Sequence, residues 1–104
     1  MQLAFVLALS IFTGTVTRVI DGDTIDVLRD SKPVRVRLAN IDAPERSQPY
    51  GREARLFIAE LILDRSVIVS PVSVDRDGRT VASVSIGGSE VALRAVEAGY
   101  AWVY

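Results

Sequence analysis

The chain has 104 residues, the size of one domain with a single core. Of these residues, 49% are hydrophobic and 24% are charged, which is typical of a globular rather than a disordered protein. The net charge of −1 excludes the overall positive charge of a strongly basic nucleic-acid-binding protein, although it leaves room for a local basic cluster. The absence of cysteine and histidine excludes disulfides, thiol nucleophiles, histidine bases and the usual zinc sites. Its chemistry must therefore use carboxylates, arginines, hydroxyls or a hard, oxygen-binding metal ion.

The N-terminal run MQLAFVLALSIF is apolar but too short to span a bilayer as a helix. Two interpretations of residues 1–14 stay open. They are the remnant of a secretory signal peptide, with Ala8 and Ser10 as small residues before a cleavage site, or an extension of the first strand. The first predicts a secreted or periplasmic protein, and the second leaves a cytoplasmic one. In both, residues 15–104 form the folded domain.

Residues 15–38 show the pattern of three short strands joined by turns. The predicted strands cover residues 15–20, 24–28 and 34–38. The segment RDSKP before the third strand is typical of a turn, and that strand alternates apolar and basic side chains. We therefore predict an antiparallel meander, with Arg35 and Arg37 on the outward face of its third strand.

The rest of the chain combines two helical segments with two further strands. In residues 52–63 the apolar side chains recur at the spacing of one helix face. After a Gly-Gly pair, Ser89 is a predicted N-cap and Gly99 the residue just beyond a second helix. The predicted elements are a helix at 52–63, strands at 67–74 and 80–86 joined by an Asp-Gly turn, and a helix at 89–98. This order predicts an α+β, mainly β fold: a five-stranded OB-fold barrel with helices between strands three and four and after strand five.

Carboxylates gather where the first and third predicted strands end. The segment VIDGDTIDV holds Asp21 and Asp23, and the segment LANIDAPE holds Asp42 and Glu45. A hairpin turn or a solvated loop explains each pair of acids when it is considered alone. Pro44, however, stiffens the second segment, and a rigid loop with acids at i and i+3 suits a hard cation held by carboxylate oxygens and a backbone carbonyl. Because the two strand ends can lie side by side in a meander, we expect Asp23 to approach Asp42.

Arginines supply the positive charge that a phosphate needs. Arg35 and Arg37 leave the third strand, and Arg79 leaves the turn before the last strand. A single surface arginine is usually a solvated charge, but a guanidinium is also the natural bidentate partner of two phosphate oxygens. Acids that hold a divalent ion beside arginines suit phosphodiester hydrolysis, and Glu45 is the best general-base candidate in a chain without histidine.

Five segments, taken in order, resemble the successive sequence blocks of the staphylococcal nuclease (thermonuclease-like) family. They are VIDGDTIDV, VRVRLANIDAPE, PYGREA, DRDGRTVA and VEAGYAWVY, and the match runs from about Thr15 to Tyr104. Each block alone is weakly specific, whereas five in the same order are highly specific. The resemblance implies an OB-fold barrel that hydrolyses DNA and RNA, preferably single-stranded, with one calcium ion per site. It also implies rupture of the 5′ P–O bond, which leaves 3′-phosphate ends.

The resemblance assigns a metal site and a catalytic set. Asp23, Asp42 and the backbone carbonyl of Ala43 match the calcium ligands of the family, and Asp21 matches an acid behind them. The catalytic positions are two phosphate-clamping arginines and an acid that binds or activates the attacking water. They match Arg37, Arg79 and Glu45. Arg76 is expected to bind substrate, next to Asp77, which stands where the type enzyme has a tyrosine.

The C-terminal segment departs from the family pattern. The chain stops at AWVY, before the C-terminal helix that relatives usually add. We expect a monomer, with association left open because of that missing helix, and no membrane partner. Trp102 and Tyr104 are interpreted as core residues in preference to nucleotide-stacking residues. The alternatives to an enzyme are a non-catalytic nucleic-acid-binding OB module and a truncated remnant; the complete set of acids and arginines favours the enzyme.

Overall fold

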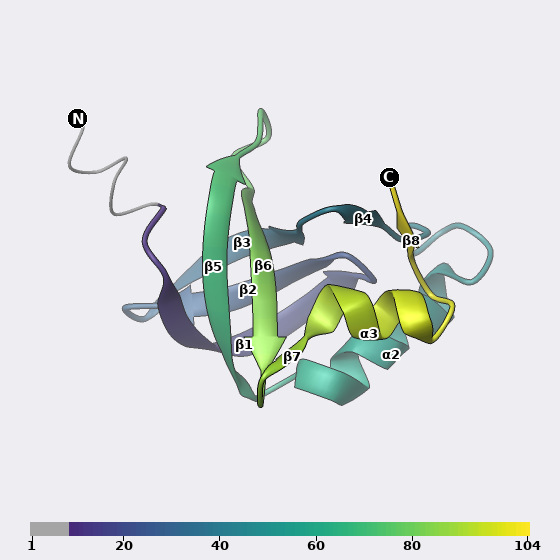
Figure 1. The fold of residues 1–104 in the computed structure, drawn as a ribbon, viewed down its shortest axis with the longest axis horizontal. Helices are drawn as coiled ribbons and strands as arrows, with labels where there is room; N and C mark the ends of the chain where they lie inside the picture. The colour runs from purple at the N-terminus through teal and green to yellow at the C-terminus, as the bar shows by residue number, and fades with distance from the viewer. Residues whose placement is uncertain (1–8) are drawn as a thin grey trace.

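The computed structural model describes residues 9–104, in which strands and helices follow the order drawn in Figure 1. The barrel strands are β1 (Phe12–Asp21), β2 (Thr24–Arg29), β3 (Lys32–Leu38), β5 (Ser66–Val74) and β6 (Thr80–Ile86). The remaining elements are β4 (Ile41–Asp42), α2 (Gly51–Ile62), β7 (Ser89–Glu90), α3 (Val91–Glu97) and β8 (Trp102–Val103). The predicted order of barrel strands and helices is therefore confirmed, and the short strands β4, β7 and β8 are additions.

The choice between a signal peptide and a strand extension for residues 1–14 concerns residues that lie largely outside the described part of the chain. Residues 1–8, most of the segment assigned to a signal peptide or a strand extension, are not described. β1 begins at Phe12 and pairs with β5 from that residue onward, so residues 12–14 belong to the barrel. Cleavage of a signal peptide stays a prediction.

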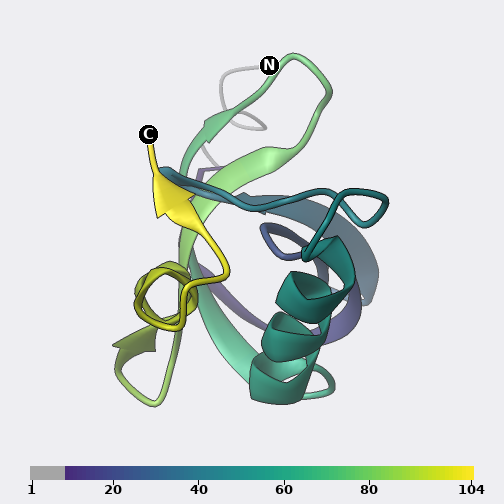
Figure 2. The same ribbon diagram turned by 90° about the vertical axis from the view of Figure 1, so that its right-hand side faces the viewer.

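The barrel closes because β1 pairs with both β2 and β5, and because β3 pairs with β6. The first part of β1 pairs antiparallel with β5, and its second part pairs antiparallel with β2. β2 then pairs with β3, and β5 with β6, again antiparallel. A parallel pairing between β3 and β6, in which Arg37 lies opposite Val81, completes the ring. The predicted five-stranded, mainly β barrel is confirmed, with both helices on one side of it (Figures 1 and 2).

The interior is filled by the inward-facing side chains of the strands and by one face of each helix. Because side chains alternate along a strand, Val36 and Leu38 are buried while Arg35 and Arg37 leave β3 on the other face. The largest fully buried side chains are Val16, Ile25, Val27, Val36, Leu38, Ile58, Ile62, Val67, Val69, Val84 and Val91. The helices therefore complete the barrel core and do not form a separate one.

Helix α2 begins and ends one residue earlier than the sequence predicted. Its buried residues are Gly51, Ala54, Ile58 and Ile62, which recur at helical spacing and face the barrel. This apolar face is the reason that the segment folds as a helix against β1. Neither helix in residues 9–104 combines the length and apolar character needed to cross a membrane.

The second helix begins later than predicted. Ser89, the predicted N-cap, and Glu90 pair instead with the end of β6 and form β7. Gly87 and Gly88 both have positive φ, 54° and 80°, and make the two-residue turn that this hairpin requires. Hairpin pairing therefore takes the residues that capping chemistry assigned to the helix, and α3 starts at Val91.

The last residues return to the segment that follows β3. β8 pairs antiparallel with β4, which places Trp102 opposite Asp42. Trp102 is 53% exposed and Tyr104 is 71% exposed, so the interpretation of both as core residues is wrong. The reason is that β8 adds to a short strand at the surface, and Ala101 fills the core position instead.

Candidate active site

A polar depression of about 430 Å³ brings together residues from several distant parts of the chain. Its lining comes from the β1–β2 turn, the end of β3, β4 with the following loop, the residue before β6, and β8. The lining residues are Asp21, Asp23, Thr24, Arg37, Asp42, Ala43, Glu45, Gln48, Arg79 and Trp102. Every position that the sequence assigned to the metal, to the acid behind it or to catalysis lies in this one depression.

Arg37 is the central cation of the depression and is largely enclosed, with its side chain 14% exposed. Its Nη2 lies 2.5 Å from Asp42 Oδ1 and 3.5 Å from Asp23 Oδ2. Its Nη1 donates to the carbonyl oxygens of Leu38 at 3.0 Å and Ile41 at 2.7 Å. Two carboxylates and two carbonyls therefore fix the guanidinium, and Asp23 and Asp42 lie on the same cation.

Asp23 is the most enclosed acid of the depression, at 8% exposure. One carboxylate oxygen accepts a hydrogen bond from the Thr24 hydroxyl at 2.9 Å, and the other accepts from the N–H of Ala43 at 3.0 Å. Its backbone carbonyl accepts from the N–H of Leu38 at 2.8 Å. Asp23 therefore joins the first hairpin to the end of β3 and to the loop after β4.

The lining carries more negative than positive charge and offers only oxygen donors. Its charged side chains are four carboxylates (Asp21, Asp23, Asp42 and Glu45) and two guanidinium groups (Arg37 and Arg79), an excess of two negative charges. Carboxylate and carbonyl oxygens are the ligands that Ca²⁺ prefers. Among the described residues, however, no three acidic side chains converge as a formed metal cluster. The donor chemistry therefore suits a hard cation, while the positive group that Asp23 and Asp42 both contact is Arg37.

Glu45 lies exposed on a loop whose backbone is held by hydrogen bonds. Its N–H donates to Gln48 Oε1 at 2.7 Å, and its carbonyl accepts from the N–H of Gln48 at 2.8 Å. The next N–H, that of Arg46, donates to Asp21 Oδ1 at 2.9 Å. Asp21 thus ties this loop to the first hairpin, and Gln48 folds the loop back on itself. The carboxylate of Glu45 is therefore positioned at the depression while remaining open to water.

Two glycines allow the backbone segments around the site to approach one another. A Cβ atom at Gly22 would lie 2.8 Å from the Cβ of Ala54 and 3.0 Å from the Cβ of Ala43. A Cβ atom at Gly51 would overlap the carbonyl oxygen of Glu45. Gly22 therefore lets the acidic turn pack against α2, and Gly51 lets the helix start directly beneath the loop that carries Glu45.

Arg79 is held by the turn between β5 and β6. Its Nε donates to Asp75 Oδ2 at 2.8 Å, and its Nη2 lies 3.6 Å from Asp77 Oδ2. Asp75 also accepts the N–H groups of Asp77 and Arg79, both at 3.0 Å. Desolvation acts to raise the pKa of Asp75, but the hydrogen bonds from Arg79 and Asp77 outweigh it, so this pKa lies below its usual value. Asp75 is therefore ionised at neutral pH and fixes Arg79.

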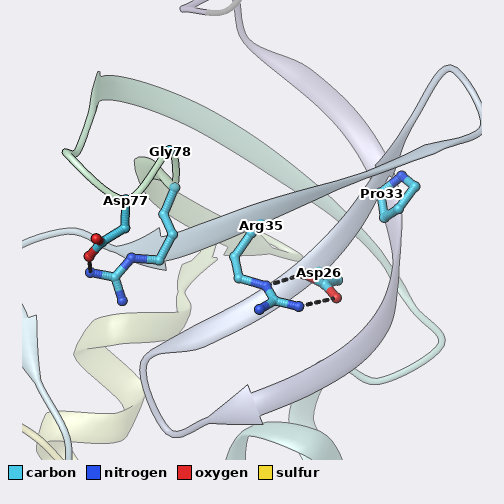
Figure 3. A pocket seen from close by; sticks show the side chains of 6 residues that line it. Asp26, Pro33, Arg35, Asp77 and Gly78 are labelled. Atoms are coloured by element: carbon cyan, nitrogen blue, oxygen red, sulfur yellow. Dashed lines mark hydrogen bonds and ion pairs between the residues drawn. The ribbon is translucent and has the colours of Figure 1, made fainter.

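Arg35 leaves β3 on the same face as Arg37 but lies in a different pocket. Its Nε and Nη2 donate to the two oxygens of Asp26 at 2.9 and 3.1 Å, and Figure 3 shows this paired contact. The hydrogen bond and the charge of Asp26 raise the pKa of Arg35. This pocket of about 440 Å³ is lined by Asp26, Pro33, Arg35, Asp77, Gly78 and Arg79. Arg79 therefore borders both pockets, whereas Arg37 belongs only to the acidic one.

Two further points separate the sequence-based site from the observed one. Arg76, assigned to substrate binding, is exposed in the β5–β6 turn and is not among the lining residues, so its role stays a prediction. Thr24 and Gln48 line the depression and were not identified from the sequence. Thr24 directly follows the acid that it contacts, which is a usable signal. Nothing in the local pattern around Gln48 indicates that it folds back onto Glu45.

Comparison with known proteins finds a nuclease family model and relatives named nuclease or endonuclease. Residues 35–104 match the family model described as staphylococcal nuclease homologue. The chain is 46% identical over 101 residues to Protein ParB of Escherichia coli, covering 88% of this chain and 56% of that protein. It is 43% identical over 102 residues to a protein named micrococcal nuclease from Shigella flexneri, covering 89% and 59%. An uncharacterized endonuclease of Escherichia coli O157:H7 is 46% identical over 92 residues, covering 88% and 60%.

The chain thus spans less than two thirds of the length of each of these relatives. The match to the family model nevertheless takes in the second half of β3, both helices, β5 and β6. It also includes Arg37, Asp42, Glu45 and Arg79 of the depression. The chain therefore belongs to the staphylococcal nuclease homologue family.

Proposed function

We propose that this chain hydrolyses phosphodiester bonds of DNA and RNA, preferably single-stranded, in a calcium-dependent reaction. The observation that carries the proposal is a single depression lined by two arginines, Arg37 and Arg79, together with Glu45 and further acids. Relatives named micrococcal nuclease and uncharacterized endonuclease support the same reaction class. The products are a 3′-phosphate and a 5′-hydroxyl end, as the family resemblance implies.

A calcium ion would be held by Asp23, Asp42 and the backbone carbonyl of Ala43, with Asp21 behind them. Bound there, it would supply positive charge to the phosphate and offset the excess negative charge of the lining. The negative charge of the lining explains why a cation is needed. A polyanionic strand approaches four carboxylates and two guanidinium groups with net repulsion unless a cation is present. The all-oxygen donor set supports this choice of a hard metal ion.

Arg37 and Arg79 bind the non-bridging oxygens of the scissile phosphate. Both guanidinium groups are already held by carboxylates or carbonyls, so little ordering is left for the moment when charge develops on phosphorus. The parallel pairing of β3 with β6 places Arg37 opposite Val81, two residues after Arg79, and both arginines line the depression. Their roles differ from that of Arg35, whose guanidinium already faces both oxygens of Asp26.

Glu45 accepts a proton from the attacking water. The water oxygen forms a new bond to phosphorus while the bond from phosphorus to the 5′ oxygen breaks, and the departing 5′ oxygen takes up a proton from solvent. Glu45 suits this role because it lines the depression and is exposed to water, while its loop is fixed by Gln48 and Asp21.

The experiment that tests the proposal uses the purified chain with end-labelled single-stranded DNA and RNA of one sequence, in calcium and in excess chelator. We expect cutting only in calcium, slower cutting of the matching duplex, and products whose 3′ ends are sensitive to a phosphatase. Cutting that persists in chelator would remove calcium from the account. Binding without cutting by a cooperatively folded protein would establish the alternative, a non-catalytic nucleic-acid-binding module.

A further inference from the structure

A second pocket, mainly apolar and about 340 Å³ in volume, adjoins the candidate active site. Its lining residues are Pro44, Gln48, Pro49, Tyr50, Gly99, Tyr100 and Trp102. Gln48 and Trp102 line both this pocket and the acidic depression. Trp102 is also the cross-strand partner of Asp42, so the indole lies one strand away from an acid of the site. A chain bound at the arginines therefore has an apolar pocket within reach of its neighbouring nucleotide.

The pocket presents aromatic rings to solvent. Tyr50 is 72% exposed and Trp102 is 53% exposed. Tyr100 is held from behind, because its ring packs on Phe57 with centroids 5.2 Å apart. Gly99 adds no side chain that would cover the space, and a Cβ atom there would meet nothing within 4 Å. Open aromatic faces around an apolar hollow offer a stacking surface for a flat ring.

Tyr50 is held in a backbone conformation that tyrosine rarely adopts. Its φ of 65° and ψ of 1° lie in the left-handed region, where a bulky side chain is strained. Its side chain makes no capping hydrogen bond to α2, and its exposure means that it contributes little to the core. Folding alone would be served as well by glycine or asparagine at this position. The ring of Tyr50 therefore calls for a role outside folding.

We propose that this pocket, bounded by Tyr50, Tyr100 and Trp102, binds one unpaired nucleobase adjacent to the phosphate held at the active site. The inference rests on the proposed function and adds a subsite to it. Stacking on aromatic side chains accepts any base, because every base has a flat π-face. A base must leave its partner to enter the pocket, so the subsite favours single strands over duplex. It contributes binding through the base and not through the phosphate.

The test uses Tyr50→Asn, which removes the ring at a position where asparagine relieves backbone strain. Trp102 is the single tryptophan of the chain, so its fluorescence reports on the pocket directly. Oligothymidylate and an abasic oligomer of equal length and charge are titrated in calcium into proteins that also carry Glu45→Gln, which keeps the strands intact while calcium is bound. We expect oligothymidylate to quench Trp102, and Tyr50→Asn to weaken its binding about tenfold, within the range for loss of one base–aromatic stack. Binding of the abasic oligomer should change less than about twofold, since no stack is lost.

Val72→Thr, which alters another exposed apolar side chain on β5, is the matched control and should leave both affinities unchanged. The thermal midpoint of Tyr50→Asn should equal or exceed that of the wild type, so that weaker binding is not a folding defect. Equal weakening for both oligomers, or no weakening, would overturn the subsite. Parallel cleavage assays in calcium separate the two claims. If the wild type cuts but Tyr50→Asn weakens binding of both oligomers equally, or of neither, only the subsite is wrong. If the wild type does not cut and the Glu45→Gln protein does not bind either oligomer, both claims are wrong.

Discussion

Arg35 and Arg37 leave the same face of β3 two residues apart, yet their surroundings are opposite. Arg35 pairs with one carboxylate, Asp26, through two hydrogen bonds, and its side chain is 46% exposed. Arg37 contacts two carboxylates and two carbonyls and is 14% exposed. In the first arrangement, one guanidinium and one carboxylate balance each other in charge, and both carboxylate oxygens accept a hydrogen bond. The second lies in a depression where acids outnumber cations.

The neighbours of β3, and not β3 itself, decide how each of the two arginines is held. Arg35 lies opposite Asp26 in the middle of the β2–β3 hairpin, so its partner is fixed by local pairing. Arg37 lies opposite Thr24, next to the turn, where the hairpin, β4 and β6 converge. Arg37, where several segments converge, therefore lines the depression, whereas Arg35, within the hairpin, pairs with its cross-strand neighbour.

The largest expected difference is in catalysis. Arg37→Ala should lower kcat/KM on single-stranded DNA by 100-fold or more, about 3 kcal/mol, the scale for removing one preorganised donor. Arg35→Ala should leave kcat/KM within about threefold and cost only about 1 kcal/mol of unfolding free energy, from the unpaired Asp26. Steady-state kinetics and urea denaturation of the two variants measure both quantities. Equal kinetic losses would erase the distinction between the two arginines.

A smaller effect, on stability and activity, is expected from changing Gly22 in the β1–β2 turn, which carries Asp23 to Arg37. In Gly22→Ala, the new methyl group would press on Ala54 and Ala43, which are fixed by their backbones, and should cost about 1–3 kcal/mol of stability. Activity should fall as well, because Asp23 and Ala43 are displaced. Gly88→Ala, in the distant β6–β7 turn with open space around it, should lose about 1 kcal/mol through its positive φ and keep its activity. Urea melts with parallel rate measurements decide this; full activity in Gly22→Ala would contradict it.

The smallest expected effect is on the pH dependence of stability when Asp75 is changed. Asp75 fixes Arg79, which borders both pockets. The folded-state pKa of Asp75 is lowered, so its stabilising contribution is present above the unfolded pKa of about 3.9 and is lost as pH falls through the folded value. Asp75→Asn should therefore be less stable than the wild type at neutral pH, and the difference should shrink below about pH 4. Denaturation curves across the acid range measure it. A difference that is constant with pH would show that Asp75 does not act through its charge.

Much of the barrel follows from local sequence pattern. The meander, the first helix and the β5–β6 hairpin are predictable because alternation, helical spacing and an Asp-Gly turn all act within a few residues. The start of α3 is not, because Ser89 suits both a helix cap and a hairpin strand, and pairing with β6 prevails. The exposure of Trp102 is likewise decided by a distant partner, the two-residue strand β4.

In the candidate site, too, local sequence predicts some features while contacts between distant segments decide others. The acids at residues 21–23 and 42–45 attract attention in the sequence because they follow strands, and the family resemblance names the arginines. What the sequence does not reveal is the support around them. Gln48 folds back on Glu45, Gly51 allows α2 to start beneath that loop, and Arg37 rests on two carbonyls. These contacts join segments whose pairing is settled only when the whole barrel closes.

The proposed reaction depends most on Glu45, which would take up the proton of the attacking water in the depression that holds Arg37. The most direct measurement compares Glu45→Gln with the wild type in two assays, cleavage of a labelled single strand and calcium-dependent binding of a nucleotide. Glu53→Gln, an exposed glutamate on α2 outside the depression, is the matched control. We expect Glu45→Gln to lose turnover by about 10²–10⁴-fold while nucleotide binding stays measurable, and Glu53→Gln to behave as the wild type. Near-normal turnover in Glu45→Gln, or equal loss of turnover and of calcium-dependent binding, would contradict the role of Glu45 as the general base.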